Sequence, residues 1–551
     1  MATKIWINQY PKGVNAEINP DKFKSVLDFY DDCIKKYGEA PAYVNMGKTL
    51  SFHEVDDLAT NFASYIQNFT NLKPGDRIAI QMPNLLQYPI VMFGALKAGL
   101  VIVNTNPLYT EREMEHQFKD AGVKGIVILS NFASKLQAIQ KNIGIETVIV
   151  SNIGDRLGGL KGAIVNFVVK FIKKMVPPYE LQDAVKLNKA LKMGATKPYT
   201  RPTIQSSEAC FLQYTGGTTG VSKGAVLTNR NILANMEQIS EWFKPVLRDG
   251  QETVITALPL YHIFALTANC LAMLKYGARN ILITNPRDMK AFLKDLNTYE
   301  FTLITGVNTL FNGLLNQPDF HKIKFSRLKL AVGGGMAVQK AVAEKWEKVT
   351  GTRLAEGYGL TETSPVVTCN PVDGRIRIGS IGLPLPGTDL KIVTDEGLEA
   401  AVGERGEIYV KGPQVMAGYW NRPEDTAQVM DGEWLKTGDI GVMDEDGFFK
   451  IVDRKKEMIL VSGFNVYPSE VEDVIALHPK VLEVGVKSIP DEKTTEAVKA
   501  FVVKKDESLT EAELKEHCKK MLTNYKVPKE IVFRTELPKS NVGKILRRLM
   551  E

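Results

Sequence analysis

The segment from Tyr214 to Ala225 carries the side chains and the glycines that an anion-binding loop needs. Glycines let a ligand approach the main chain closely, and a row of backbone N–H groups can wrap an anion while hydroxyls and an ammonium add donors. The segment therefore predicts a site for a polyphosphate. Its twelve residues are Tyr214, Thr215, Gly216, Gly217, Thr218, Thr219, Gly220, Val221, Ser222, Lys223, Gly224 and Ala225.

This loop follows the apolar run 209–212, which is typical of a buried strand, so we expect it at a strand end. It is not a Walker A loop, because Gly220 is followed by Val-Ser-Lys and the order Gly-Lys-Ser/Thr is missing. An ordinary glycine-rich turn is the alternative, and the density of donors disfavours it.

A second segment, residues 356–365, combines an aromatic ring, a hydroxyl and a carboxylate. Tyr358 offers a face for a purine, Thr361 a hydroxyl for a phosphate, and Glu362 a hard oxygen ligand for Mg²⁺. Glu362 by itself would be an ordinary surface acid, but beside the phosphate loop it favours a nucleotide site. The nucleotide contacts expected in this segment are Glu356, Gly357, Tyr358, Gly359 and Thr361.

Tyr261 and His262 are candidates for the rim of a pocket. They follow the strand predicted at 253–258 and precede an apolar run, which favours the rim of a pocket. A lone histidine is more often a satisfied core or turn residue, and that interpretation stays open from the residues alone.

Three glycines and two charged side chains complete the candidates. The run Gly333, Gly334 and Gly335 ends another predicted strand and permits flat, close contact; a hinge is the alternative. Asp439 could bind the two hydroxyls of a ribose. Lys544 follows Gly543, so its ammonium could be delivered into a site built by another domain, although a lone lysine in a basic tail is usually solvated.

Together these motifs resemble those of the adenylate-forming superfamily, which includes acyl-CoA synthetases, luciferases and the adenylation domains of peptide synthetases. The similarity covers nearly the whole chain and points to the bacterial long-chain fatty acyl-CoA synthetases, whose signature stretch resembles residues 431–456. It implies that the phosphates of ATP lie on 214–225, that the triple glycine packs on adenine, and that Tyr261 and His262 line the entrance for the carboxylate substrate.

The resemblance also implies the remaining roles. Lys544, Thr215, Glu362 and His262 are the expected catalytic residues, and Thr215 and Glu362 the expected partners of Mg²⁺. Asp453 is the expected hinge, with Arg454 near the ribose. A small domain would swing about Asp453, withdrawing Lys544 and bringing the loop at Gly463 to the site for CoA; such a hinge can gate successive steps.

The implied reaction joins a fatty acid to ATP, giving an acyl-adenylate and pyrophosphate, and then transfers the acyl group to CoA, releasing AMP. A ligase for another acyl or aryl carboxylate, a fatty acyl-AMP ligase, a luciferase-like oxygenase and a non-catalytic nucleotide or lipid sensor remain alternatives. A peptide-synthetase adenylation domain is disfavoured, because residues 259–262 contain no aspartate to hold a substrate ammonium.

The elements that must position these residues alternate along the chain. Short apolar strands, such as those predicted at 101–104, 122–129 and 147–150, are separated by helical patterns and predict a parallel or mixed α/β sheet. We expect a large domain over 1–452, with α/β subdomains to about 380 and a β-rich subdomain over about 381–452, in which the run 415–420 reads as a strand. A hinge at 453–456 and a small α+β domain over 457–551 follow, where Ser469 is expected to cap a helix.

The composition fits a globular cytoplasmic enzyme. A chain of 551 residues is too long for a single core, and 44% of its residues are hydrophobic. The net charge of +6 suits anionic substrates or a membrane surface but is too small to indicate nucleic acid. Five widely spaced cysteines predict free thiols in a reducing compartment, and no signal peptide or spanning segment is expected. The acyl-chain length and the oligomeric state, including a homodimer, stay open.

One stretch, residues 162–176, departs from the α/β alternation. Its apolar residues recur at helical spacing, and Lys161, Lys170, Lys173 and Lys174 interrupt or flank them. A basic amphipathic helix that bears aromatic rings can lie in the interface of a bilayer, which would give peripheral contact with an anionic membrane. A helix buried against its own domain is the alternative.

Overall fold

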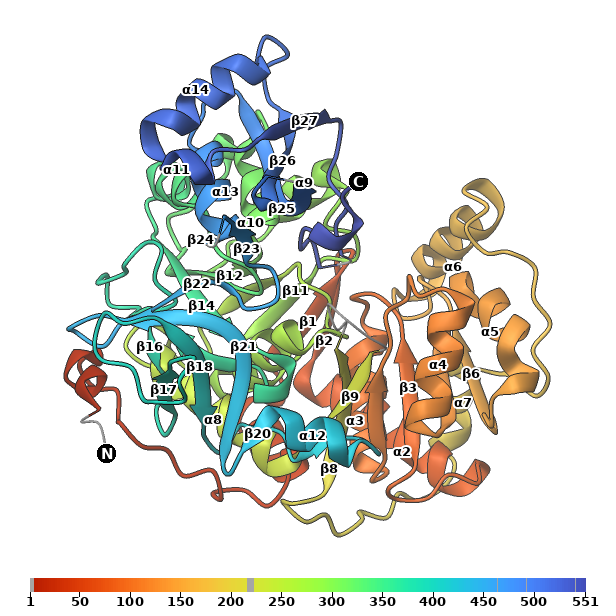
Figure 1. Ribbon diagram of the computed structural model, residues 1–551. Coiled ribbons are helices and arrows are strands. Elements are labelled where there is room, and N and C mark those ends of the chain that lie inside the picture. The colour runs from red at the N-terminus through yellow and green to blue at the C-terminus, as the bar shows by residue number, and fades with distance from the viewer. Residues whose placement is uncertain (1–3, 216–221, 463, 492, 541) are drawn as a thin grey trace.

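The computed structural model describes residues 4–215, 222–462, 464–491, 493–540 and 542–551. Among these residues, strands form four sheets, and helices pack around them (Figure 1). The mixed parallel and antiparallel pairing confirms the predicted α/β class. In the same described ranges, no helix is both long and apolar enough to cross a membrane.

The first large sheet holds eight strands, and its central pairs are parallel, since β3 pairs β4 and β5, and β4 pairs β8. The predicted strand at 101–104 is reproduced as β4. In spatial order the strands are β19 (Gly418–Tyr419), β9 (Lys223–Thr228), β8 (Ala209–Thr215), β4 (Val101–Asn104), β3 (Arg77–Gln81), β5 (Val123–Leu129), β6 (Thr147–Ser151) and β7 (Val185–Lys186).

The second large sheet holds nine strands, with six parallel neighbours at its centre, from β14 to β1. In spatial order these are β16 (Leu383–Pro384), β15 (Val366–Cys369), β14 (Leu354–Gly359), β13 (Leu330–Gly333), β12 (Leu303–Gly306), β10 (Thr253–Thr256), β11 (Arg279–Leu282), β1 (Pro41–Asn45) and β2 (Lys48–Ser51). Loops at the carboxyl ends of such parallel strands are where ligands collect in α/β folds.

Two smaller sheets follow in the chain. The first is antiparallel and comprises β17 (Asp389–Val393), β18 (Gly406–Lys411), β20 (Met430–Asp431), β21 (Trp434–Met443) and β22 (Phe449–Arg454). The second comprises β23 (Ile459–Val461), β24 (Phe464–Val466), β25 (Val481–Asp491), β26 (Thr495–Lys504) and β27 (Glu530–Arg534). The second sheet packs on a hydrophobic cluster of its own, which includes Ile459, Val471, Val502 and Leu514.

The helices have the following bounds: α1 (Val26–Tyr37), α2 (Phe52–Phe69), α3 (Gln87–Lys97), α4 (Glu111–Ala121), α5 (Ala133–Ile139), α6 (Gly159–Phe167), α7 (Leu187–Gly194), α8 (Asn229–Phe243), α9 (Met289–Thr298), α10 (Asn308–Leu315), α11 (Lys340–Thr350), α12 (Pro423–Val429), α13 (Pro468–Ala476) and α14 (Glu511–Met521). Helix α3 is buried along its whole length, as expected for a helix enclosed by other elements.

Two local expectations are wrong. The run 415–420 does not join the small antiparallel sheet; its strand β19 pairs with β9 at the edge of the eight-stranded sheet. Ser469 does not cap α13, because Pro468 already occupies the first turn and the helix begins one residue earlier, after Tyr467. A proline is well suited to a first helical turn, where its missing N–H costs nothing.

The helix predicted at 162–176 is present, but it lies three to four residues earlier in the chain, over 159–172. Helix α6 continues into a single π-helical segment, η4 (Val168–Ile172), and the chain leaves it at Lys173. This helix projects from the edge of the molecule at the right of Figure 1. Its larger apolar side chains, Leu160, Ile164, Phe167, Phe171 and Ile172, are exposed, which argues against a helix buried within its own domain.

Candidate active site

The predicted phosphate loop connects the two strands of an antiparallel hairpin. Strand β8 runs to Thr215 and β9 starts at Lys223, and these two residues face each other in the ladder. The strand predicted to precede the loop is therefore confirmed. Six of the loop residues, Gly216, Gly217, Thr218, Thr219, Gly220 and Val221, lie outside the described residues.

The residues that flank the loop are held by the scaffold. The Tyr214 hydroxyl donates to Asp120 Oδ2 at 2.6 Å, and Arg422 Nη2 lies 2.8 Å from Asp120 Oδ1. Lys223 Nζ forms an ion pair with Asp425 of α12, so its ammonium is turned to that carboxylate. Three further loop residues are placed: the Ser222 carbonyl lies 3.2 Å from His116 Nε2, and Gly224 and Ala225 are buried in β9.

Thr361 and Glu362 lie beside this hairpin. The short helix η8 (Thr361–Thr363) contacts both β8 and β9, and Thr361 is half-buried there. The Tyr419 hydroxyl donates to Glu362 Oε1 at 2.6 Å. Because β19 carries Tyr419 and pairs with β9, the same hairpin sets the position of the Glu362 carboxylate. Tyr419 is a positioning residue that sequence reasoning missed.

The carboxylate of Asp439 contacts two other predicted site residues. The Tyr358 hydroxyl donates to its Oδ2 at 2.6 Å, and Arg454 Nε lies 3.3 Å from its Oδ1. Asp439 and Arg454 also face each other in the β21–β22 ladder. Burial, and next the charge of Asp439, raise the pKa of Tyr358 well above its ordinary value, so the phenol stays protonated and remains a donor.

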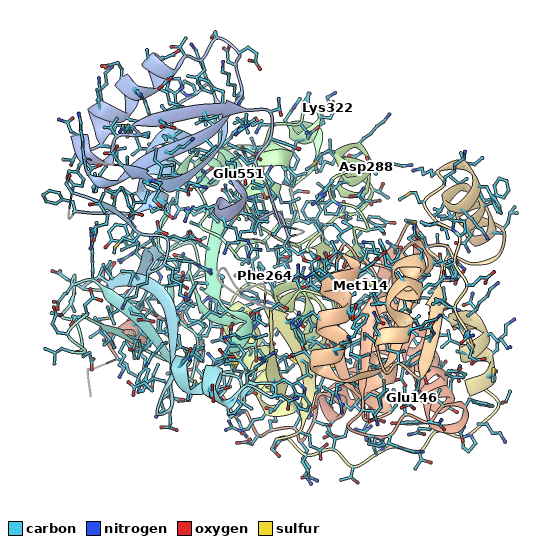
Figure 2. All side chains as sticks on the ribbon, turned by 45° about the vertical axis from the view of Figure 1, so that its right-hand side comes forward. Met114, Glu146, Phe264, Asp288, Lys322 and Glu551 are labelled. Atoms are coloured by element: carbon cyan, nitrogen blue, oxygen red, sulfur yellow. The ribbon has the colours of Figure 1, made fainter. Side chains whose placement is uncertain are left out.

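The triple glycine meets two other predicted segments at Gly334. A Cβ added there would lie 3.1 Å from the carbonyl of Gly357 and 3.1 Å from a ring carbon of Phe264. Phe264 is labelled near the centre of the molecule in Figure 2. A side chain at this position would therefore have to displace β14 or the phenyl ring. Of the other two glycines, Gly333 ends β13 and Gly335 is exposed with φ +75°.

Glu356 precedes Gly357 in β14, and its side chain is buried beneath the surface that Gly334, Gly357 and Phe264 form. It is buried, and its Oε1 accepts a hydrogen bond from the backbone N–H of Val338 at 3.3 Å. Burial raises the pKa of Glu356 to about 8, so the carboxyl is mainly neutral near pH 7. Gly359, the last residue of β14, pairs with Val366 of β15.

Tyr261 and His262 are tied to the same region. The Tyr261 carbonyl accepts a hydrogen bond from Gln213 Nε2 at 2.7 Å, which joins this turn to β8 two residues before Thr215. His262 Nδ1 accepts from the backbone N–H of Phe264 at 3.3 Å. Burial, and next the charge of Lys544, lower the pKa of His262 to about 4, so the imidazole is neutral at physiological pH.

Lys544 reaches this site from the C-terminal segment. Burial, and next the charge of Arg454, lower its pKa to about 8, while Asp439 and Glu457 act in the opposite direction. The charge of Lys544 in turn acts on His262. The structure therefore brings His262, Asp439 and Arg454 within electrostatic range of Lys544. The turn that presents the lysine is closed by a hydrogen bond from its N–H to Ser540 Oγ at 3.1 Å.

Asp453, the predicted hinge, is buried near the end of β22. Its Oδ2 accepts a hydrogen bond from the N–H of Ser469 at 2.8 Å, and its Oδ1 lies 3.3 Å from Arg547 Nη1. Both partners belong to the C-terminal part of the chain, so the hinge carboxylate is anchored there. Sequence reasoning missed Arg547, although it stands three residues after Lys544. Gly463 lies outside the described residues.

The oxygen ligands available at Glu362 fit a magnesium ion that is held mainly by phosphates. In the described part of the chain, no three His, Cys, Asp or Glu side chains converge as a metal cluster. The Tyr419 hydroxyl donates to Glu362 Oε1. Mg²⁺ is commonly bound by one or two carboxylates together with substrate phosphates, and a single carboxylate beside a phosphate loop matches that mode.

Comparison with known proteins agrees with this geometry. Residues 30–420 match the AMP-binding enzyme family, and residues 470–544 match the AMP-binding enzyme C-terminal domain. The chain is 55% identical to a long-chain-fatty-acid–CoA ligase of Yersinia pestis, with 99% of this chain and 97% of that protein covered. A protein of the same name from Haemophilus influenzae is 52% identical, with 99% and 98% covered.

Solved structures share the fold over the whole length. The ATP-bound MatB from Rhodopseudomonas palustris superposes with a TM-score of 0.81 at 26% identity, covering 96% of this chain and 98% of that one. The anthranilate CoA ligase AuaEII in complex with anthranoyl-AMP gives a TM-score of 0.86 at 24% identity, with 96% and 98% covered, and supports the fold alone. The chain therefore belongs to the AMP-binding enzyme family, within the adenylate-forming superfamily that its motifs resemble.

Proposed function

We propose that the protein is an AMP-forming long-chain fatty acid–CoA ligase. It activates a fatty acid with ATP, giving an acyl-adenylate and pyrophosphate, and then forms acyl-CoA and AMP. The observation that carries this proposal is the identity of 52–55% to proteins named long-chain-fatty-acid–CoA ligase, which extends over 97–98% of their length. The convergence of Lys544, His262, Asp439 and Arg454 supports an adenylate site in this chain.

The first half-reaction brings two anions together. A carboxylate oxygen attacks the α-phosphate of ATP, a bond to that phosphorus forms, and pyrophosphate leaves with the bonding electrons. Catalysis of this kind depends on positioning and on positive charge where negative charge develops. Lys544 supplies an ammonium, and the loop from Thr215 to Ala225 supplies hydroxyl and amide donors. His262 lines the entrance for the carboxylate substrate. Because its imidazole is neutral, it forms no ion pair that would trap the carboxylate before it reacts.

Thr215 and Glu362 are the residues that would hold Mg²⁺ with the phosphates of ATP. The ion, when bound, neutralises phosphate charge. Asp439, which is paired with Arg454, accepts the hydrogen bond that holds Tyr358 beside the expected nucleotide, and Asp439 is also the expected partner of the ribose hydroxyls. Gly334 keeps the wall between Phe264 and Gly357 flat, which suits the face of an adenine.

In the second half-reaction, the CoA thiolate attacks the acyl carbonyl and AMP leaves. We propose that residues 1–452 and 457–551 act as two domains joined at 453–456, and that the smaller one turns about Asp453. This movement would withdraw Lys544 and bring the loop at Gly463 to the acyl-adenylate. The separate hydrophobic cluster of the C-terminal sheet supports a part that can move as a unit.

Peripheral contact with an anionic membrane is the second part of the proposal. Long-chain fatty acids partition into bilayers, so an enzyme that acts at the cytoplasmic face of a membrane meets its substrate there. Helix α6 and η4 expose Ile164, Phe167, Phe171 and Ile172, each by more than half of its surface. Lys170 of η4 and Lys173 and Lys174 just after it are also exposed. Exposed apolar side chains with lysines beside them suit a surface of anionic lipid.

The experiment that tests the activity supplies the purified protein with ATP, Mg²⁺, CoA and carboxylates from acetate to oleate. Pyrophosphate, AMP and acyl-CoA are measured for each acid. We expect the highest kcat/KM with long chains and equal amounts of AMP and acyl-CoA. Preference for acetate or for an aryl acid would overturn the long-chain assignment. Release of pyrophosphate without any thioester would indicate a fatty acyl-AMP ligase instead.

A further inference from the structure

Two side chains of α10 hold the C-terminal part of the chain by direct hydrogen bonds. The Thr309 hydroxyl donates to the carbonyl of Gly543 at 2.9 Å. One turn along the helix, Asn312 Nδ2 donates to the carbonyl of Leu482 at 2.9 Å. Gly543 directly precedes Lys544, so the first bond is made to the peptide that carries the lysine. We call Thr309 and Asn312 the α10 latch.

Helix α10 is a firm platform for these contacts. It follows β12, which lies inside the nine-stranded sheet, and it buries Leu310, Phe311 and Leu314 against the core. The Phe311 ring packs on Trp346 with the ring centroids 4.8 Å apart. The outward-facing Thr309 and Asn312 are half-buried beneath the C-terminal segment. A bond to such a helix fixes its partner relative to the sheet that builds the site.

The contact at Gly543 is close. This glycine has φ +84°, and a Cβ added to it would lie 2.7 Å from Thr309 Oγ1 and 3.2 Å from Val307 Cγ2. The backbone before Lys544 therefore rests directly on the start of α10. A shift of the C-terminal segment away from α10 must move Lys544 as well.

The two latch bonds act on one connected unit. Leu482 lies in β25, and its neighbour Glu483 pairs with Lys539 at 2.6 Å, close to the turn that presents Lys544. Further along, Lys487 Nζ donates to the carbonyl of Met550 at 2.5 Å, which ties the end of the chain to the same strand. Because β25 and the lysine-bearing turn are joined on both sides, Asn312 also constrains Lys544.

We propose that the α10 latch positions Lys544 for acyl-adenylate formation and has no part in thioester formation. Thr309 and Asn312 are positioning residues, since they touch the segment that carries Lys544 and not the reacting atoms. The inference rests on the proposed role of Lys544 in the first half-reaction. Two neutral hydrogen bonds of ordinary strength correspond together to roughly a tenfold or larger effect on how often the lysine is in place.

The test uses Thr309→Val, Asn312→Leu and the double variant of the full chain. Acyl-adenylate formation is measured as pyrophosphate exchange into ATP with oleate, and thioester formation is measured from pre-made oleoyl-adenylate and CoA. We expect the double variant to lose about tenfold in the first rate and to stay within about twofold of the parent in the second. Thr309→Ser keeps the hydroxyl and should retain the parent rate.

Gln317→Leu is the matched control. This amide lies just past the end of α10, and its Nε2 donates to the carbonyl of Gly313 in the same helix at 3.4 Å. Gln317→Leu removes an amide, as Asn312→Leu does. The hydrogen bond that is lost joins Gln317 to its own helix and not to a C-terminal residue, so both rates should stay at the parent level. A Tm within about one degree of the parent shows that the latch variants remain folded.

Lys544→Ala separates failure of the latch from failure of the proposed function. If Lys544→Ala slows adenylate formation but the double variant does not, the latch inference is wrong and the role of Lys544 stands. If Lys544→Ala leaves adenylate formation unchanged, the role assigned to Lys544 is wrong and the latch loses its purpose. Equal loss of both half-reactions in the double variant would mean that α10 acts only in general stability, which also overturns the inference.

Discussion

At the scale of single residues, the role proposed for Lys544 in the first half-reaction depends on the charge of its ammonium. Burial lowers its pKa to about 8, so the ammonium is present below that pH and is lost as the pH rises through it. We expect kcat/KM for acyl-adenylate formation to be about tenfold lower at pH 9 than at pH 7, because kcat/KM reports the free enzyme. Measurement of pyrophosphate exchange from pH 6 to 10 checks this.

Lys544→Arg is the control for that profile. A guanidinium stays protonated over the whole range, so any activity that the variant keeps should not fall above pH 8. Bound ATP is anionic and stabilises the ammonium, so the parent's kcat profile should fall at a higher pH than its kcat/KM profile. A parent kcat/KM that is flat to pH 10 would contradict the lowered pKa.

Glu362 gives a second prediction at this scale. Glu362→Gln removes one charge from the side chain expected to hold Mg²⁺, so the Mg²⁺ concentration for half-maximal activity should rise by roughly tenfold. Tyr419→Phe keeps the carboxylate but removes the hydroxyl that orients it at 2.6 Å, and should give a smaller rise. An unchanged magnesium requirement in Glu362→Gln would mean that ATP and water alone hold the ion.

The sequence could indicate site residues where several residues of distinctive type stand close together in the chain. The cluster of glycines and hydroxyls at 214–225 is such a signal, and so is the presence of Tyr358 and Glu362 in one short segment. Tyr419 and Thr309 gave none, because their roles come from contacts with residues 57 and 234 positions away. A single sequence holds no information on which distant side chain will face a hydroxyl.

At the scale of elements, strands that pair locally or lie in the parallel sheets were predictable from their apolar runs. The strand at 101–104 coincides with β4, and that at 147–150 is one residue shorter than β6. Residues 415–420 were assigned to the wrong sheet. Strand β19 pairs with β9, nearly 200 residues earlier, and a pairing so distant leaves no pattern in a two-residue strand.

The junction between β22 and α13 supports a prediction at this scale. Arg547 Nη2 lies 2.6 Å from Glu472 Oε2, and the same guanidinium pairs with Asp453 and Glu457. Arg547→Met would leave buried carboxylates without their cation, and removal of one partner from such a cluster costs about 3 kcal/mol. We expect the C-terminal part to unfold at a lower urea concentration, as followed by limited proteolysis at several urea concentrations.

Arg534→Met is the matched control for Arg547→Met. Arg534 is exposed and pairs with the carbonyl of Glu551, and an exposed pair of this kind contributes little. Its urea midpoint should stay near that of the parent. If Arg547→Met is as stable as Arg534→Met, the charged cluster at Asp453 does not stabilise the junction between β22 and α13.

At the scale of the whole molecule, one helix exposes an unusual amount of apolar surface. Along α6, η4 and the three residues after them, six large apolar side chains are half or more exposed, namely Leu160, Ile164, Phe167, Phe171, Ile172 and Met175. The sequence could show the amphipathic pattern but not whether its apolar side meets the protein or the surroundings. That depends on where the helix projects, which Figure 1 shows to be away from the sheets.

The prediction that follows is salt-sensitive binding to anionic vesicles through this helix. Lys170 lies over the Phe171 ring, with Nζ 5.3 Å from the centroid, so charge and apolar surface face the same region. Each basic residue near an anionic surface is worth about 1 kcal/mol, and salt weakens it. Lys170→Glu, Lys173→Glu and Lys174→Glu together should greatly reduce cosedimentation with vesicles that contain phosphatidylglycerol, while activity on a short, soluble acid stays near that of the parent.

The matched control changes Lys505, Lys519 and Lys520 to Glu. These lysines are exposed on and near α14, far from α6 in Figure 1, and their replacement shifts the net charge of the chain by the same amount. If both triple variants lose binding equally, the overall charge of the protein, and not the helix, attracts it to the vesicles.

A third variant, Phe167→Ser with Phe171→Ser, keeps every lysine and removes the two rings, whose centroids lie 5.1 Å apart. Retained binding at high salt in that variant would show that the rings do not enter the bilayer, and pelleting of the Lys170, Lys173 and Lys174 variant at the parent level would contradict the membrane proposal.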